Sequence, residues 1–214
     1  MTTARVTDAE RRRTQMVDRQ LRRRGIIDAR VLEAMARVPR EEFVPPAIAE
    51  RAYDDAALTI GYAQTISQPF IVAAMCELLA LEGSERVLDV GTGSGYAAAV
   101  LDELAASVVS IELVAPLAER ARGALERTGH AGVEVRVGDG TRGAPDRAPF
   151  DAISVAAATA RVPPALYDQL AVGGRIVLPR GRSGGQRLVR IVRTEGGAVE
   201  TASLACRFVP LVAD

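Results

Sequence analysis

The sequence contains no lysine: all 27 of its basic residues are arginine. A Walker-type phosphate loop, a Schiff-base lysine and a pyridoxal anchor each require a lysine amine, so all three are excluded. The single histidine, His130, and the two cysteines, Cys76 and Cys206, are too few for an ordinary zinc site or a disulfide framework. We expect no metal site, and we interpret both cysteines as buried thiols in a reducing compartment.

Long hydrophobic runs and an excess of one charge are also missing. No apolar run approaches the roughly 20 residues of a membrane-spanning helix, and the N-terminus is polar rather than signal-like. The 27 acidic residues balance the 27 basic ones, so no net field draws the chain to nucleic acid or anionic lipid. We therefore expect a cytoplasmic monomer that binds neither membrane nor nucleic acid.

The first part of the chain, residues 1–82, is expected to be a helical segment that packs on a core formed by residues 83–214. Apolar residues recur at helical spacing, at Val31, Leu32, Met35 and Val38. Asp28 is a plausible cap for this helix, and Pro39 ends it. Two runs of three arginines could form a nucleic-acid arm, but balanced charge and the lack of interleaved aromatics favour a solvated helix face.

Residues 51–70 are rich in Thr, Ser, Gln and Tyr and show no clear period. A polar segment among helices, just before a nucleotide-binding fold, is a candidate active-site loop. The alternative is a plain connector in which Ser67 caps the next helix, two residues before Pro69. Both interpretations can hold at once.

From residue 84 onward the pattern alternates between strand and helix. Strands are expected at 86–90, 107–111, 133–137, 150–155 and 175–178, and helices at 96–106, 115–127 and 163–170. Two further segments, 187–192 and 203–212, flank Gly196-Gly197 and indicate a C-terminal antiparallel hairpin. The fold class is therefore α/β, a doubly wound, mostly parallel seven-stranded sheet of the Rossmann-like type.

The chain is organised around residues 86–96, RVLDVGTGSGY, a short apolar strand that runs through a glycine-rich turn into a helix. Gly91, Gly93 and Gly95 allow positive φ and leave room for a ligand. Their spacing is not the Gly-x-Gly-x-x-Gly of the dinucleotide fingerprint. Asp89 would also repel a phosphate, so the turn favours a ligand without one.

Two more acids follow at strand ends. Glu112, 21 positions after Gly91, can accept hydrogen bonds from ribose hydroxyls, and Asp139 can accept one from an exocyclic amine. Three acids around a glycine loop, with no lysine, describe a phosphate-free nucleoside. S-adenosylmethionine fits, because it has an amino-acid tail, a sulfonium charge, a ribose and an adenine.

Residues 87–95, VLDVGTGSG, resemble the first motif of class I S-adenosylmethionine methyltransferases, and residues 64–69, QTISQP, resemble the signature of protein-L-isoaspartate O-methyltransferases. Further segments similar to that family are 38–45, 52–54, 137–140, 148–153, 169–179 and 208–212. The resemblance runs from about residue 16 to the C-terminus, and the chain is identified as a member of this family.

The resemblance implies methyl transfer from S-adenosylmethionine to the free carboxylate of L-isoaspartyl residues in damaged proteins, whose ester then closes to a succinimide. It implies that Ser67 is the active-site serine. The implied cofactor-binding residues are Thr65, Ile66, Ser67, Gln68, Asp89, Gly91, Thr92, Gly93, Glu112, Leu113, Asp139 and Gly140. The implied substrate-binding residues are Thr65, Ser67, Val209 and Pro210.

Two alternatives remain from the sequence. One is a methyltransferase of the same build that acts on another carboxylate or on a small molecule, and the other is a non-enzymatic S-adenosylmethionine-binding module. Arg161 lies near the expected cleft and could pair with substrate carboxylates, and Arg180 stands where the family more often has a small apolar residue. For both arginines the alternative is solvation at the surface. A hydrolase is disfavoured, because Ser94 does not sit in a Gly-x-Ser-x-Gly elbow and no usable histidine accompanies it.

Overall fold

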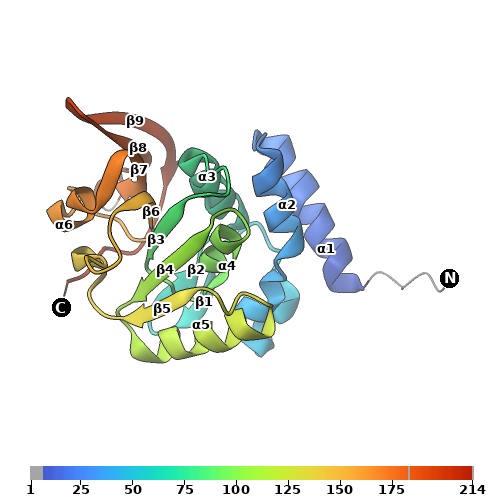
Figure 1. Cartoon of the computed structure of the whole chain (residues 1–214). Coiled ribbons are helices and arrows are strands. Elements are labelled where there is room, and N and C mark those ends of the chain that lie inside the picture. The colour runs from blue at the N-terminus through green and yellow to red at the C-terminus, as the bar shows by residue number, and fades with distance from the viewer. Residues whose placement is uncertain (1–6, 183, 214) are drawn as a thin grey trace.

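The structure is a computed structural model that describes residues 7–182 and 184–213. Its centre is a seven-stranded sheet in the order β5-β4-β3-β6-β7-β8-β9 (Figure 1). The strands are β3 (Arg86–Val90), β4 (Ser107–Glu112), β5 (Glu134–Val137), β6 (Phe150–Val155), β7 (Leu170–Arg180), β8 (Gln186–Thr194) and β9 (Gly197–Cys206). Neighbours from β5 to β7 are parallel, and β8 and β9 are antiparallel. The predicted mostly parallel sheet with a C-terminal antiparallel hairpin is confirmed.

Both faces of the sheet are covered. Val87 on β3 and Val177 on β7 belong to a large hydrophobic cluster, whereas their neighbours Leu88 and Ile176 belong to a second cluster. Successive strand residues point to opposite faces, so strands covered on both sides must be apolar at nearly every position. The large cluster takes in helices α3 (Pro69–Leu79), α4 (Tyr96–Asp102) and α5 (Ala115–Arg127), and the second takes in α6 (Pro164–Asp168).

The N-terminal segment adds a layer of helices beside α3 and α4 (Figure 1). It consists of α1 (Asp8–Met16), a π-helical turn η1 (Val17–Leu21), α2 (Ala29–Arg37) and the 3₁₀ turns η2 (Arg22–Arg24), η3 (Arg40–Phe43) and η4 (Pro46–Arg51). Asp28 caps α2 as predicted, because its carboxylate accepts hydrogen bonds from the backbone N–H groups of Arg30 and Val31. Met16 and Met35 are buried in the large cluster, so this segment packs on the core. Among the described residues, no helix has the length and apolar character to cross a bilayer.

The segment 51–70 holds a feature that the sequence did not predict. Strands β1 (Leu58–Gly61) and β2 (Gln64–Ile66) pair as a small antiparallel hairpin separate from the main sheet. The prediction that Ser67 caps α3 is wrong. Pro69 is the first residue of α3, so the N-cap is Gln68, and no side chain forms a capping hydrogen bond there.

Several predicted boundaries are corrected. The last strand is not 203–212, because β9 pairs with β8 from Gly197 to Cys206. Its first half is exposed, as suits an edge strand, and Val199 is its one large apolar residue, so it gave no alternating apolar signal. After β9 the chain leaves the sheet, and Pro210 bridges to Ala158. Helices α4 and α6 are shorter than predicted, and β7 is longer. Cys76 is buried, but Cys206 is only partly so.

Candidate active site

A cavity of about 1440 Å³ opens where the parallel strands β3, β4 and β6 end. Carboxyl ends of such strands form the ligand crevice of doubly wound sheets where the strand order reverses, here between β3 and β6. Four parts of the chain form most of its walls: residues 64–68, the loops after the parallel strands, residues 181–182 and 184–187 around the β7–β8 turn, and the C-terminal segment 205–212. The structure therefore brings together segments that are far apart in the sequence.

Residues 91–94 of the glycine loop line the cavity, and backbone hydrogen bonds hold the loop in place. The N–H groups of Gly91 and Thr92 donate to the carbonyl oxygen of Ile111 at 2.8 and 3.2 Å. Gly95 has a φ of +90°, and a Cβ there would lie 3.2 Å from the Cβ of Ala121 on α5. Glycine at this position thus lets α4 start close against α5.

Glu112, at the end of β4, presents the one carboxylate on the described wall of the cavity. Its Oε2 accepts a hydrogen bond from the N–H of Gly93 at 2.7 Å, and its Oε1 accepts one from the N–H of Val114 at 2.9 Å. Each carboxylate oxygen has two lone pairs, so both can still accept a hydroxyl. Glu112 can therefore hold the glycine loop in place and bind a ribose at the same time.

The other two predicted acids lie behind the wall. Asp89 is fully buried, and its Oδ2 accepts a hydrogen bond from the hydroxyl of Ser110 at 2.7 Å, which lies 2.5 Å from the hydroxyl of Thr92. Burial raises the pKa of Asp89 to about 6, although the Ser110 hydrogen bond lowers it. Asp139 accepts hydrogen bonds from the backbone and hydroxyl of Thr141 at 2.8 and 2.7 Å. Neither carboxylate lines the cavity.

Gly140, which follows Asp139, does line the cavity. A Cβ on it would lie 2.5 Å from Cγ1 of Val90, so only glycine fits without displacement of β3. The remaining predicted site residues share the wall: Thr65, Ile66, Ser67, Gln68, Gly91, Thr92, Gly93, Leu113, Val209 and Pro210. Arg161 and Arg180 do not, and Arg180 forms an ion pair with Glu200.

A buried arginine fixes the backbone at Ser67. Arg40 has no exposed surface; its guanidinium donates to the carbonyl oxygens of Ala52 at 2.7 Å and Ser67 at 2.8 Å. Its Cζ lies 4.7 Å from the ring centroid of Tyr96, a favourable cation–π distance. Burial lowers the pKa of Arg40. Sequence reasoning missed this residue, since one arginine among 27 carries no distinguishing signal.

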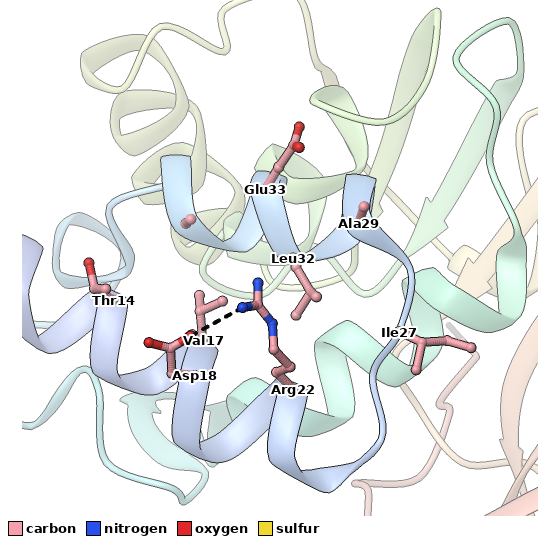
Figure 2. A pocket seen from close by; sticks show the side chains of 9 residues that line it. Thr14, Val17, Asp18, Arg22, Ile27, Ala29, Leu32 and Glu33 are labelled. Carbon is pink, nitrogen blue, oxygen red and sulfur yellow. Dashed lines mark ion pairs between the residues drawn. The ribbon is translucent and has the colours of Figure 1, made fainter.

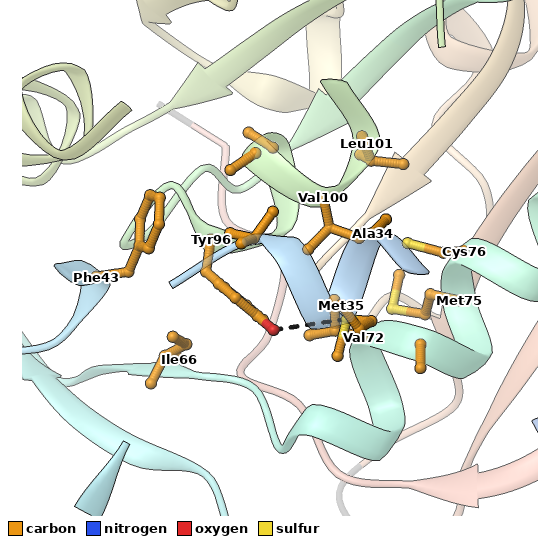
Figure 3. Close-up of a cluster of buried hydrophobic side chains, with 14 of the residues drawn as sticks. Ala34, Met35, Phe43, Ile66, Val72, Met75, Cys76, Tyr96, Val100 and Leu101 are labelled. Carbon is orange, nitrogen blue, oxygen red and sulfur yellow. Dashed lines mark hydrogen bonds between the residues drawn. The ribbon is translucent and has the colours of Figure 1, made fainter. Parts of the chain in front are cut away.

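Tyr96, whose ring lies against the guanidinium of Arg40, belongs to the helix that follows the glycine loop. It is the first residue of α4 and lines the cavity, and its ring packs edge-on against Phe43 with centroids 5.7 Å apart. Figure 3 shows its hydroxyl directed at the sulfur of Met35, 3.5 Å away. Arg40 therefore joins the loop of Ser67 to the helix that follows the glycine loop.

Other candidate groups lie elsewhere. His130 is buried beside Asp102, with its Nδ1 3.0 Å from a carboxylate oxygen, and it does not line the cavity. A smaller cavity of about 460 Å³ lies between η1 and α2, where Arg22 pairs with Asp18 at 3.6 Å (Figure 2). It contains none of the predicted site residues. The described residues include no group of three or more metal-binding side chains.

The segment 208–211 closes one side of the large cavity. The N–H of Ala158 donates to the carbonyl oxygen of Val209 at 2.7 Å, and the N–H of Leu211 donates to Ala158 at 2.8 Å. The side-chain amide of Gln186 brackets the backbone of Phe208, with contacts of 2.7 and 3.2 Å. This places Val209 beside the loop that follows β6.

Comparison with known proteins identifies relatives over nearly the whole chain. The profile of the protein-L-isoaspartate(D-aspartate) O-methyltransferase family matches residues 11–214. Protein-L-isoaspartate O-methyltransferase 2 of Marinobacter nauticus is 56% identical over 204 residues, which cover 94% of this chain and 93% of the relative. The protein-L-isoaspartate O-methyltransferase of Gloeobacter violaceus is 53% identical over 197 residues, which cover 92% and 96%.

Solved structures give the same picture. A protein-L-isoaspartate O-methyltransferase superposes with a TM-score of 0.82 at 30% identity, over 92% of this chain and 65% of that one. A structure from Plasmodium falciparum in complex with S-adenosyl-L-homocysteine gives a TM-score of 0.83 at 24% identity, over 94% and 99%. At 24% identity, the similarity to the Plasmodium falciparum structure shows a shared fold and no more.

Proposed function

The chain belongs to the protein-L-isoaspartate(D-aspartate) O-methyltransferase family, and we propose that it repairs damaged proteins by methylating the free carboxylate of their L-isoaspartyl residues. One observation carries the assignment to this cavity. The glycine loop with Glu112 and the loop of Ser67 with Val209 and Pro210 line the same cavity. A donor site and an acceptor site thus adjoin, as direct transfer between two bound molecules requires.

S-adenosylmethionine is the cofactor, and the residues present fit it. Glu112 offers a carboxylate to ribose hydroxyls, and the glycine loop carries no cation that would hold a phosphate. The residues that would hold the cofactor are Thr65, Ile66, Ser67, Gln68, Gly91, Thr92, Gly93, Glu112, Leu113 and Gly140, with Asp89 and Asp139 behind them. When bound, it supplies an electrophilic methyl group on a sulfonium centre.

The residues of this chain act by orientation and by exclusion of water. A carboxylate is already a nucleophile at neutral pH, so the site needs no general base, and His130 is not among the residues that line the cavity. Charge is lost as a neutral ester forms, so removing water from the site favours the reaction. Ser67 orients the acceptor, since a strong hydrogen bond to the ground-state carboxylate would weaken its nucleophilicity. Correct placement can lower a barrier by about 7–11 kcal/mol across a whole site.

The direct test offers the enzyme labelled S-adenosylmethionine with two peptides that differ only in isoaspartate or aspartate. We expect base-labile label in the isoaspartyl peptide alone. Label in neither peptide, with the cofactor still bound, would overturn the assignment in favour of another carboxylate or small-molecule acceptor, or of a binding module.

We further propose a monomer located in the cytoplasm that does not bind nucleic acid. The distribution of exposed apolar side chains supports a monomer, because Val137 and Val199 lie on β5 and β9, the two opposite edge strands of the sheet, and Ile27 lies just before α2. Both cysteines are free thiols, which suits a reducing compartment, and the net charge is zero. Light scattering, cell fractionation and a nucleic-acid gel shift test these points. The boundary between an N-terminal helical segment, residues 1–82, and a core, residues 83–214, also stays a prediction.

A further inference from the structure

The large cavity has an uneven distribution of charge. Its charged lining residues are Glu112, Arg182, Arg187 and Arg207. Glu112 lies at the end of β4 and accepts hydrogen bonds from the backbone of the glycine loop. The three arginines come from the opposite side, near the β7–β8 turn and the end of β9. In a chain with equal numbers of acids and bases, this wall is strongly positive.

These arginines are exposed and lack acidic partners. None of the three guanidinium groups forms an ion pair with a carboxylate of the described residues, whereas nearby Arg180 pairs with Glu200. The guanidinium of Arg187 donates a hydrogen bond to the carbonyl oxygen of Ser203, which carries no net charge. In the β8–β9 pairing Arg187 lies opposite Ala205, and Arg207 comes directly after β9, which ends at Cys206, so both arginines lie at the same end of this strand pair. Their charges therefore remain available to a bound molecule.

We propose that Arg182, Arg187 and Arg207 form a specificity-determining arginine wall that selects isoaspartyl segments with acidic side chains close to the damaged residue. This inference rests on the proposed function and names the class of polypeptide that the site prefers. The wall lies beside the segment 208–211, where the acceptor polypeptide would enter. Glutamate or aspartate side chains on that polypeptide would face three cations, while Glu112, the one acid of the described lining, lies at the end of β4 beside the glycine loop.

The wall acts on association rather than on the chemical step. Exposed charges steer an oppositely charged partner and raise its association rate, and the effect weakens as salt is added. At physiological ionic strength the screening length is about 8 Å, so acidic residues within two or three positions of the isoaspartate benefit most. The preference should therefore appear in KM and should decline with ionic strength, while kcat stays similar.

The test uses the full chain and two isoaspartyl peptides of identical length, one with two glutamates and one with two lysines beside the isoaspartate. We expect kcat/KM to favour the acidic peptide about tenfold at low salt, mainly through KM, and the ratio to shrink towards one in 0.5 M NaCl. The double variant Arg182→Glu/Arg207→Glu should reverse the preference. The matched control Arg19→Glu/Arg23→Glu changes charge equally on exposed residues of η1 and η2, outside the cavity, and should retain it.

Each outcome decides the question. Equal kcat/KM for the two peptides with the unaltered chain would overturn the arginine wall while leaving isoaspartyl methylation intact. The same reversal in the control variant would also overturn it, because the effect would then come from net charge. Methylation of neither peptide would overturn the proposed function and the wall with it. The comparison on the unaltered chain needs no variant, so an unstable variant does not prevent a result.

Discussion

The carboxylate Oε2 of Glu112 accepts a hydrogen bond from the backbone nitrogen of Gly93, 2.7 Å away, so the end of β4 fixes the loop that follows β3. The same carboxylate faces the cavity. One side chain thereby shapes the glycine loop and offers hydrogen-bond acceptors to a ligand, and its removal should affect both.

For this reason Glu112→Ala should raise the Kd for S-adenosylhomocysteine about tenfold or more, because a charge-assisted hydrogen bond is worth about 1.5–3 kcal/mol. Isothermal titration calorimetry measures this directly. Glu126→Ala, at an exposed position of α5, is the control and should bind as the unaltered chain does. Unchanged affinity in Glu112→Ala would show that the ribose is held elsewhere.

Ser67→Ala should lower turnover of an isoaspartyl peptide and leave cofactor affinity within a few-fold. The hydroxyl orients the acceptor, whereas the backbone of Ser67 stays anchored by Arg40. Single-turnover kinetics and cofactor titration separate the two effects. Ser84→Ala, on an exposed residue outside the cavity, serves as the control. Unaltered turnover would remove Ser67 from the mechanism.

Arg40→Lys tests whether the hydrogen bond from Arg40 to the carbonyl oxygen of Ser67 contributes to turnover. Lysine keeps the charge, but a single ammonium does not reproduce the planar fork that donates to both Ala52 and Ser67. We expect kcat for an isoaspartyl peptide to fall about tenfold, with cofactor Kd changed less than threefold.

Arg30 provides a matched comparison for this experiment. Its guanidinium also donates to two carbonyl oxygens, those of Leu81 and Leu104, each at 3.2 Å, but neither leucine lines the cavity, whereas Ser67, which Arg40 anchors, does. Arg30→Lys should lower Tm without changing kcat. If the two variants lost stability and activity in parallel, Arg40 would have only a structural role.

Asp89 gives a prediction about pH. Its pKa is about 6 in the folded chain because of burial, against about 3.9 in an unfolded one. Between these values the folded state binds more protons, so ionisation of Asp89 reduces stability as pH rises from about 4 to 6, by roughly 3 kcal/mol in total. The unfolding free energy of Asp89→Asn, relative to the unaltered chain, should therefore increase across that range. Parallel curves from pH 4 to 7 would contradict the raised pKa.

Much of the fold could be predicted because its local signals agree with its tertiary structure. The glycine turn at 91–95, the cap at Asp28 and the apolar strands each follow from local rules. The β1–β2 hairpin could not be predicted, since its turn places Tyr62 and Ala63 at φ values of 53° and 56°. Residues such as tyrosine and alanine rarely adopt that backbone conformation, so the residues at positions 62 and 63 gave no turn signal.

The site was predicted less completely than the fold. The motif located the loop, but Asp89 alternates with Leu88 and Val90 along β3, so its side chain points to a sheet face rather than beyond the strand end. Such an orientation depends on strand register. Arg40 and the arginine wall depend on contacts between distant segments, which one sequence of arginine-rich composition cannot reveal.

The segment 208–211 runs outside the sheet and is held by four hydrogen bonds, two at Ala158 and two at Gln186. Its release would break those bonds and remove the partly buried side chains of Phe208 and Leu211 from the edges of the two hydrophobic clusters, while the buried residues of each cluster stay packed. Local opening of this kind costs less than global unfolding. The entrance to the acceptor site therefore has an opening equilibrium of its own, and the amide of Leu211 should exchange with deuterium well before those of β6 do.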